Sequence, residues 1–357
     1  MKNNWNIKDI LLLTYFKNFK LSQIFKIIDE FENINSFFES DFFNNLFSNI
    51  TKQQIKDYEE QVNNQFELAE KNNTKIISYF DDNYPELLKN TSSPPIILFI
   101  RGNYHKNLTN ISVVGTRKPT YYGKISTENF VESFVKNNIA IVSGLAYGID
   151  TISHLSAIKY NGITYAILPS SIDTISPANS KKNAEKIIDN GGALISEYKF
   201  GTQANLASFP QRNRIIAGIS IATLVVECGL KSGALITAKI SNSESREVFA
   251  VPGNINSEKS KGTNKLIKDN LAIIATSPED VLNELGLLIY QNNDQKFDIL
   301  DDIDENKIYQ VLNSEPIHID SILELTDLDL ATISSKLLFL EMKGLIKQLP
   351  GKLYIKV

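Results

Sequence analysis

Apolar residues in the first 65 positions recur at the spacing of a helix and do not alternate as they do in a half-buried strand. The pattern predicts a small helical domain over residues 1–65, similar in outline to SAM or helix-hairpin-helix domains. The turn at 17–20 lacks the glycines that a helix-hairpin-helix needs to bring backbone amides against a phosphate, so we interpret the domain as a packing or interaction module. The positions with helical spacing are Ile10, Leu13, Phe16, Ile24, Phe25, Ile28 and Phe31.

From residue 75 the pattern changes to short, continuous apolar runs separated by segments of helix length. The runs lie at 111–115, 140–143, 163–168, 193–196, 222–227, 248–251 and 271–275. Strands that are apolar throughout, joined by helices, are typical of a parallel sheet that is covered on both faces. The sequence therefore predicts a Rossmann-like α/β domain over residues 75–289, with a doubly wound, mostly parallel sheet.

A polar, acidic stretch then predicts a linker over residues 290–305. Helical spacing returns over residues 306–357, which end in two short strands across the turn Pro350-Gly351. Three helices followed by a hairpin are the outline of a winged helix. From Ile308 onward there are 5 Lys against 6 Asp and Glu, whereas a domain that reads duplex DNA should carry an excess of cations. A partner-docking role is therefore favoured for this domain.

Composition excludes several classes of protein. The single cysteine, Cys228, excludes a disulfide within the chain, and none of the three histidines is spaced as a metal ligand, so we expect a reducing compartment and no metal. The N-terminus lacks the pattern of a signal peptide, and the apolar runs are far shorter than the roughly 20 residues of a membrane helix. We expect a cytoplasmic protein that does not enter the membrane.

Charge gives only a weak indication of the ligand. The formal net charge of −4 offers no general attraction to nucleic acid. The segment 111–289 is the least acidic part, with 18 Lys and Arg against 15 Asp and Glu, and a solvated surface would explain this balance equally well.

Ligands of open parallel sheets bind beyond the carboxyl ends of the strands, so the residues after each apolar run are the candidates for a site. After the first run, Gly115 lets the backbone approach an anion, and Arg117 can form a bidentate contact with a phosphate. A tight turn with a solvated arginine explains this pair equally well. After the second run, Ser143 and Gly144 are expected at a helix start, where amides and the helix dipole favour phosphate.

Later strand ends offer further donors and cations. Lys181 and Lys182 lie in a polar loop, and Ser232 and Gly233 stand at another expected helix start. Two arginines and an amide also begin one helix, and we interpret this cluster, Arg212, Asn213 and Arg214, as an anion site.

No catalytic set is recognisable. The pattern GxGxxG of dinucleotide-binding proteins is absent, which disfavours a nicotinamide cofactor, and no other cofactor is expected. Glu227 has neither a nucleophile nor a histidine beside it, so we expect it to pair with a neighbouring arginine, and we interpret His154 as packed or solvated. The sequence thus favours binding over covalent chemistry.

Five segments, SGLAYGID, FPQRNRIIAGIS, SGALITA, FAVPG and KGTNKLI, occur in this order and resemble the DNA-processing family DprA/Smf. The resemblance is dense from Tyr84 to Asn270 and looser in the flanking domains. It implies a homodimer that binds and protects single-stranded DNA and loads the RecA recombinase onto it during natural transformation and recombination.

The resemblance also implies roles for particular residues. Arg117 matches the family's DNA-contacting arginine, and Lys182, with Lys181 beside it, lies where a lysine contacts the DNA backbone. Ser176-Pro177 departs from the Tyr-Pro usual at that place. The residues Arg212, Asn213 and Arg214 fall in the family motif FPxRNR, and Leu266 and Ile267 are expected to contribute to the dimer.

Two other functions compete with this one. The first is a nucleotide-processing enzyme of the phosphoribohydrolase type on a similar sheet, but its PGGxGT signature is absent. The second is a winged-helix transcription regulator with a ligand-sensing core, which only the C-terminal outline supports. A mobility shift with single-stranded and duplex DNA would separate them.

Overall fold

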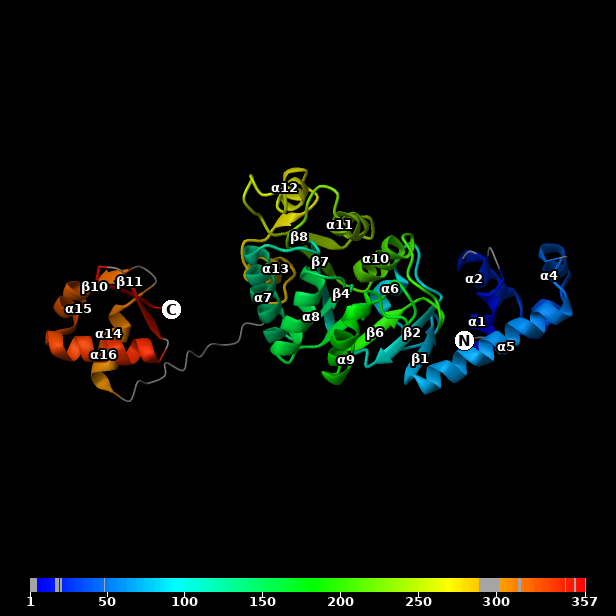
Figure 1. The fold of residues 1–357 in the computed structure, drawn as a ribbon, viewed down its shortest axis with the longest axis horizontal. Coiled ribbons are helices and arrows are strands. Elements are labelled where there is room, and N and C mark those ends of the chain that lie inside the picture. The colour runs from blue at the N-terminus through cyan, green and yellow to red at the C-terminus, as the bar shows by residue number, and fades with distance from the viewer. Residues whose placement is uncertain are drawn as a thin grey trace. The chain divides into compact units, whose positions relative to one another are not determined.

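The computed structural model describes residues 5–16, 19, 21–47, 49–288, 302–313, 316–343, 345–349 and 351–356. Contacts divide the chain into two compact units, Met1–Leu288 and Ile289–Val357 (Figure 1). Residues 290–301 of the predicted linker lie outside the described residues.

The larger unit begins with four short helices and one long helix around a core that is rich in phenylalanine. The helices are α1 (Ile7–Leu13), α2 (Leu21–Glu30), α3 (Ile34–Phe38), α4 (Asp41–Leu46) and α5 (Lys52–Lys71). Asn6 and Thr51 both close capping boxes, which satisfy the first free amides of α1 and α5. The prediction of a small helical N-terminal region is confirmed.

A sheet of nine strands forms the centre of the larger unit. The strands are β1 (Thr74–Ser78), β2 (Ile97–Gly102), β3 (Thr109–Val114), β4 (Ile139–Ser143), β5 (Thr164–Ile167), β6 (Ala193–Ser196), β7 (Ala222–Val225), β8 (Glu247–Ala250) and β9 (Ile273–Ile274). Their order is β1-β2-β6-β5-β4-β3-β7-β8-β9. β1 and β2 pair antiparallel, and all pairs from β6 to β9 are parallel, which confirms the predicted mostly parallel sheet.

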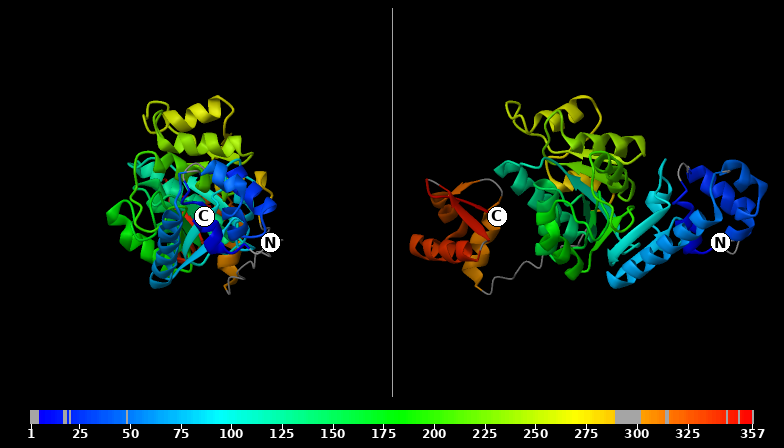
Figure 2. Two further views of the ribbon diagram at one scale, coloured as in Figure 1. Left: turned by 90° about the vertical axis from the view of Figure 1, so that its right-hand side faces the viewer. Right: turned by 45° about the vertical axis from the view of Figure 1, so that its right-hand side comes forward.

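Helices cover both faces of this sheet (Figures 1 and 2). They are α6 (Glu86–Lys89), α7 (Tyr121–Lys136), α8 (Ile149–Lys159), α9 (Lys181–Asp189), α10 (Ser208–Gly218), α11 (Gly233–Ser243), α12 (Lys261–Lys268) and α13 (Pro278–Glu284). Alternate residues of a strand point to opposite faces. Val113 of β3 accordingly packs with Phe130 of α7, and Val114 packs with Ile215 of α10. This confirms the doubly wound class.

The N-terminal helices are joined to the loop after β6. Nζ of Lys199 donates to the carbonyl oxygen of Thr14 (3.2 Å) and lies 3.2 Å from the ring centroid of Tyr15. The amide of Phe200 donates to Oε1 of Gln65 (2.7 Å). Burial lowers the pKa of Lys199 to about 8, because the charged form loses water there.

The order of the strands predicts one crevice at the edge of the sheet where the strands have their carboxyl ends. The chain proceeds from β3 to β4 on one side, and β7 pairs with the other side of β3. At such a switch point the loops that follow two adjacent strands turn in opposite directions and leave a space between them. The carboxyl ends of β3 and β7 therefore border the expected ligand site.

The smaller unit has the elements of a winged helix, as predicted. It comprises α14 (Ile303–Val311), β10 (Ile317–His318), α15 (Ile319–Thr326), α16 (Leu330–Met342), β11 (Ile346–Leu349) and β12 (Leu353–Lys356), with strand order β10-β12-β11. Ile308, Ile322, Ile333 and Leu337 form its core. Pro350 of the expected turn lies outside the described residues, and Gly351 adopts a positive φ of 88°.

Within the described ranges, no helix has both the length and the apolar character required to cross a membrane.

Candidate nucleic-acid interface

A cleft of about 500 Å³ opens at the carboxyl ends of β3 and β7. Its lining brings together six of the residues that the sequence predicted as a site: Gly115, Arg117, Arg212, Asn213, Ser232 and Gly233. Four segments that are distant in the sequence contribute to it, namely the loop after β3, the start of α8, α10 and the start of α11. The cleft coincides with the switch point of the sheet.

The loop after β3 forms one wall, and its glycine is required by close packing. A Cβ on Gly115 would lie 2.5 Å from Cγ1 of Ile149 and 2.9 Å from the carbonyl oxygen of Glu227. The amide of Thr116 donates to that same oxygen (2.7 Å), which ties the loop to the end of β7. Arg117, which follows, is exposed, and its guanidinium carbon lies 5.6 Å from the ring centroid of Phe209.

The start of α8 is pressed against this loop. Gly148 has a φ of 80°, and a Cβ there would lie 2.2 Å from the carbonyl oxygen of Thr116. The same oxygen accepts from the amide of Ile149 (3.1 Å). The rim of the cleft is thus formed by two backbone segments that pack closely and are hydrogen-bonded to each other. These contacts fix the backbone from which the Arg117 side chain extends.

Arg212 lies beneath the cleft and has a structural role. Its side chain is 4% exposed, and Nη1 donates to the carbonyl oxygens of Gly144 (2.6 Å) and Ile167. Burial lowers its pKa to about 10, an effect that the charge of Asp150 opposes. A Cβ on Gly144 would lie 2.4 Å from Nη1 of Arg212, so this glycine makes room for the guanidinium.

Ser143 and Gly144 do not present free donors, contrary to the prediction. Ser143 is the last residue of β4, and its Oγ donates to the carbonyl oxygen of Val113 (2.7 Å). The amide of Gly144 donates to Oδ2 of Asp150 (3.1 Å). Both groups are therefore engaged within the protein. The helix they were expected to begin starts only at Ile149.

The start of α11 forms the opposite wall and offers free donors. Ser232 caps the helix, and its Oγ accepts from the amide of Ala234 (3.3 Å). Gly233 is exposed, and Lys231 stands immediately before the cap. Among the described residues no ion pair engages Lys231 or Arg117. The positive end of the helix dipole and two free cations thus border one space.

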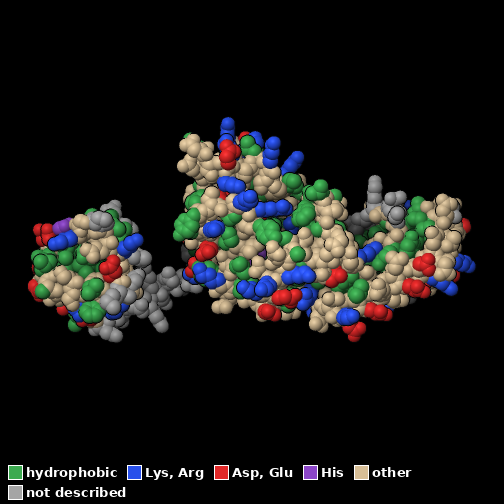
Figure 3. All heavy atoms as spheres, in the orientation of Figure 1, with side chains coloured by type: hydrophobic (Ala, Val, Ile, Leu, Met, Phe, Trp, Pro, Cys, Tyr) green, Lys and Arg blue, Asp and Glu red, His purple; other side chains and the backbone are tan. Residues whose placement is uncertain are grey.

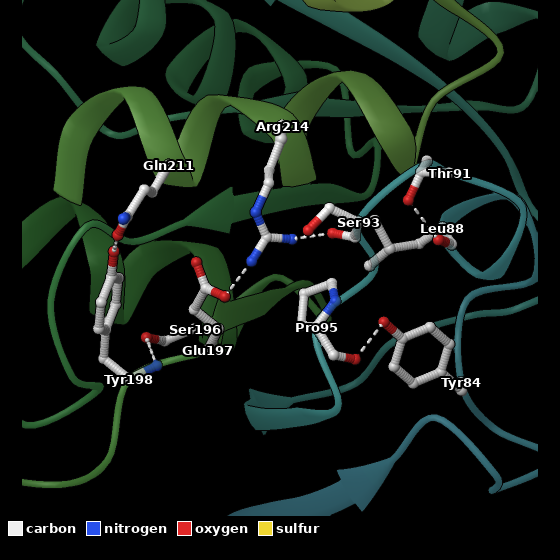
Figure 4. A network of polar contacts seen from close by, with 10 residues as sticks. All are labelled: Tyr84, Leu88, Thr91, Ser93, Pro95, Ser196, Glu197, Tyr198, Gln211 and Arg214. Carbon is white, nitrogen blue, oxygen red and sulfur yellow. Dashed lines mark hydrogen bonds and ion pairs between the residues drawn. The ribbon is translucent and has the colours of Figure 1, made fainter. Parts of the chain in front are cut away.

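Arg214 is not part of the cleft lining, although it is only two residues from Arg212. Figure 4 shows its contacts. Its Nη1 donates to the carbonyl oxygen of Ser93 (2.6 Å), and its Nη2 pairs with Oε2 of Glu197. Burial raises the pKa of Glu197, and the charge of Arg214 opposes this shift. The guanidinium of Arg214 therefore links residue 93 to the end of β6. This corrects the expectation that Arg214 is part of an anion site.

Lys181 and Lys182 are the first residues of α9 and are exposed. Neither lines the cleft. They follow β5 through the loop and the short 3-10 helix Ala178–Ser180, so they start on another part of the carboxyl edge of the sheet.

Glu227 and His154, the two residues weighed as bases, are both buried. Glu227 accepts from the amide (2.8 Å) and Oγ1 (2.6 Å) of Thr120, so the expectation that it pairs with an arginine is wrong. His154 lies within hydrogen-bond distance of Thr164, 2.6 Å from Nδ1 to Oγ1, and burial lowers its pKa to about 3. Both residues hold the fold together.

The two expected dimer residues differ in their surroundings. Leu266 is 6% exposed and belongs to the core on the α10 and α11 face of the sheet. Ile267 is half-buried beside that core and lines a groove along β9, the edge strand. Of the pair, Ile267 is the better placed to meet a partner.

Thr116, Phe209 and Lys231 also line the cleft, and they were not selected from the sequence. Lys231 directly precedes the expected cap Ser232, so its charge could have been noticed. Phe209 belongs to the FPQRNR motif, but only the fold shows that its ring meets Arg117.

Lys and Arg side chains gather over the upper part of the larger unit, where Figure 1 shows α11 and α12 (Figure 3). Lys239 of α11 and Lys268 of α12 are exposed, as is Lys231 just before α11. Positive side chains that lie close together add their potentials, although Lys261 and Lys265 of α12 are paired with Glu258 and Asp269.

Comparison with known proteins shows two matching family models. The model described as DNA recombination-mediator protein A matches residues 75–286, and the one described as DprA winged helix domain matches residues 299–352. Protein Smf of Escherichia coli (strain K12) is 33% identical over 298 residues, covering 79% of this chain and 77% of the relative.

Two solved structures are also similar. The X-ray structure of DNA processing protein A from Streptococcus pneumoniae is 30% identical with a TM-score of 0.59, and the match covers 79% of this chain and 94% of that chain. A structure that describes the single-stranded DNA binding mode of DNA processing protein A from Helicobacter pylori is 28% identical with a TM-score of 0.54. That match covers 59% of this chain and 95% of the other.

Proposed function

Because this chain belongs to the DprA/Smf family of DNA recombination-mediator proteins, we propose that it binds single-stranded DNA at the cleft between β3 and β7. It would protect incoming DNA and deliver it to the RecA recombinase during natural transformation. The observation that carries the proposal is that Arg117 and Lys231 line one cleft at a switch point and that neither forms an ion pair with a described residue.

The charge of the cleft suits a phosphate. Among the described residues, Asp150 is the only acidic one in the lining, and its carboxylate accepts from the amide of Gly144 and faces the charge of Arg212. Arg117 can reach a phosphate with two parallel donors, and the exposed start of α11 adds amide donors at Gly233. A phosphate bound here would therefore contact Arg117, Lys231 and the amides at the start of α11, and no carboxylate of the lining would be free to repel it.

The size of the cleft favours a single strand over a duplex. A volume of about 500 Å³ is comparable to a small-ligand pocket, and it cannot admit a double helix. A single strand has a flexible backbone and can direct one nucleotide into a concave site. The relative from Helicobacter pylori, whose structure concerns single-stranded DNA binding, supports the same ligand.

The geometry supports binding rather than catalysis. The carboxylate of Glu227 caps the loop before α7, and His154 is buried with its pKa far below neutrality. A general base needs access to a substrate proton and a pKa near the working pH. Neither residue meets both conditions, so we propose no covalent step at this cleft.

Delivery to RecA and assembly as a homodimer rest on the family. We infer RecA as the partner from the family resemblance, and we assign the groove along β9 with Ile267 to the dimer. The winged-helix unit is the part that we assign to partner docking, because its charges give no excess of cations for duplex DNA.

Titration of labelled single-stranded and duplex oligonucleotides at several salt concentrations tests the proposal. We expect tighter binding to the single strand, with affinity that falls as salt rises because phosphate contacts release counterions. Arg117→Ala should lower the affinity for the single strand about ten- to a hundredfold, the worth of one charge-assisted contact. Lys136→Ala, at the far end of α7, is the matched control. Equal binding of both DNA forms would refute the proposal.

A further inference from the structure

Two tyrosine rings project into solvent beside the cleft. Tyr121 is 79% exposed and Tyr147 is 48% exposed. A ligand that covers an exposed ring at the edge of a binding site removes apolar area from water, which favours binding.

Both rings are attached to the backbone that forms the cleft rim. Tyr147 directly precedes Gly148, where a Cβ would lie 2.6 Å from the carbonyl carbon of Arg117. Tyr121 is the first residue of α7, four residues after Arg117, and the preceding Thr120 is fixed to Glu227. The two rings therefore come from the two segments that hold Arg117 in place.

The faces of these rings are free, in contrast to that of a neighbouring tyrosine. The hydroxyl of Tyr122 donates to the carbonyl oxygen of Pro252 (2.7 Å), so that ring is anchored within the protein. For the described residues, no side-chain hydrogen bond, ring pair or cation–π contact involves Tyr121 or Tyr147. Nothing in the fold itself accounts for their exposure.

Cations are interleaved with the rings. Lys118 and Lys124 are exposed, and no described acidic residue forms an ion pair with either of them. Lys124 lies three residues after Tyr121 and so shares its face of α7. Alternating rings and cations suit a single-stranded nucleic acid, whose bases stack on the rings while its phosphates meet the cations.

We propose that Tyr121 and Tyr147 stack on bases of the strand whose backbone is held at the cleft. The strand then leaves the cleft across the start of α7, where Lys118 and Lys124 follow its phosphates. Stacking tolerates any base, because every base has a π face, and it excludes a duplex, whose bases already stack on one another. This inference rests on the proposed function.

The test separates base contacts from backbone contacts. Affinity is measured for an oligothymidylate and for an abasic deoxyribose-phosphate strand of equal length, using the full chain. Tyr121→Ser and Tyr147→Ser should each weaken binding of the oligothymidylate about five- to tenfold, the lower part of the range for one stacked base. Neither should change binding of the abasic strand.

Two further variants serve as controls. Tyr121→Phe and Tyr147→Phe keep a ring without its hydroxyl and should bind the oligothymidylate as the unmodified protein does. Tyr160→Ser removes a ring at the other end of α8 and should have no effect on either strand.

Each remaining outcome overturns a defined part of the argument. If Arg117→Ala weakens binding while both serine variants bind the oligothymidylate normally, the stacking inference fails and the proposed function stands. Equal losses on both strands would show that the rings do not act through bases. A lower mass of the serine variants in light scattering would assign the rings to a second copy of this chain. If Arg117→Ala is also without effect, the proposed function itself fails.

Discussion

Replacing Arg212 with alanine should destabilise the larger unit rather than remove a contact with DNA. Arg212 is 4% exposed, and its guanidinium donates to the carbonyl oxygens of Gly144 and Ile167. It also faces the buried carboxylate of Asp150. Alanine would leave two strand-end carbonyls without this donor and Asp150 without its counter-charge.

The expected loss of unfolding free energy is about 3–5 kcal/mol, the usual result of removing one partner of a buried charge pair. Each charge-assisted hydrogen bond contributes about 1.5–3 kcal/mol, so the two bonds alone account for most of it. A free energy of this size is a large fraction of the stability of an ordinary domain.

Urea unfolding followed by circular dichroism measures the loss. The variant Asp150→Asn with Arg212→Ala is the informative control, because it also removes the uncompensated carboxylate and should recover part of the stability. A loss below about 1 kcal/mol for Arg212→Ala would refute the structural role. DNA affinity of the folded fraction should fall less than it does for Arg117→Ala.

The pH dependence of this variant has a definite sign. Burial raises the pKa of Asp150 above its ordinary value, and the charge of Arg212 opposes that shift. Without Arg212 the folded-state pKa rises further, so the folded state binds more protons than the unfolded state. The destabilisation caused by the buried Asp150 carboxyl is absent below the pKa that this group has in the unfolded state. It grows as pH rises from there toward the pKa of the group in the folded state. Arg212→Ala should therefore be closest to the unmodified protein in acid.

Three further predictions concern other parts of the larger unit. Lys181→Ala with Lys182→Ala should weaken single-strand binding and flatten its salt dependence with unchanged urea unfolding, because both residues are exposed; an unaltered salt slope would exclude them from the DNA path. Ile267→Glu should lower the mass measured by light scattering, and an unchanged mass would exclude the groove along β9 as the dimer surface. Leu266→Arg should instead unfold the protein, because Leu266 is buried. Burial lowers the pKa of Lys199 to about 8 in the folded state, so between pH 8 and the pKa of the unfolded state the unfolded chain binds more protons and stability should rise with pH. Urea unfolding of Lys199→Met should not show this rise.

The fold could be predicted from the sequence because its signals are local. Runs such as 140–143 and 222–227 are apolar on both faces, which only a sheet covered by two layers of helices explains. The strand order was not predicted. It depends on which strands pair, and each pairing depends on contacts between distant segments.

Four of the six predicted residues that line the cleft were selected because they follow strand ends, and the other two, Arg212 and Asn213, come from the α10 motif. Gly115, Arg117, Ser232 and Gly233 all follow strands that meet at the switch point, so a rule about carboxyl ends selects them. Ser143 was selected by the same rule, but its hydroxyl is bound to a neighbouring strand. The rule locates an edge of the sheet and says nothing about which donors are already engaged.

The motif around α10 shows why adjacency in sequence misled the prediction. Successive residues of a helix are rotated by about 100°, so side chains two positions apart point in nearly opposite directions. Arg212 therefore turns beneath the cleft, while Arg214 turns toward Glu197 and residue 93 (Figure 4). A cluster of cations in the sequence becomes two separate structural contacts, and the free positive charge of the cleft comes instead from Arg117 and Lys231, on loops that the sheet brings together.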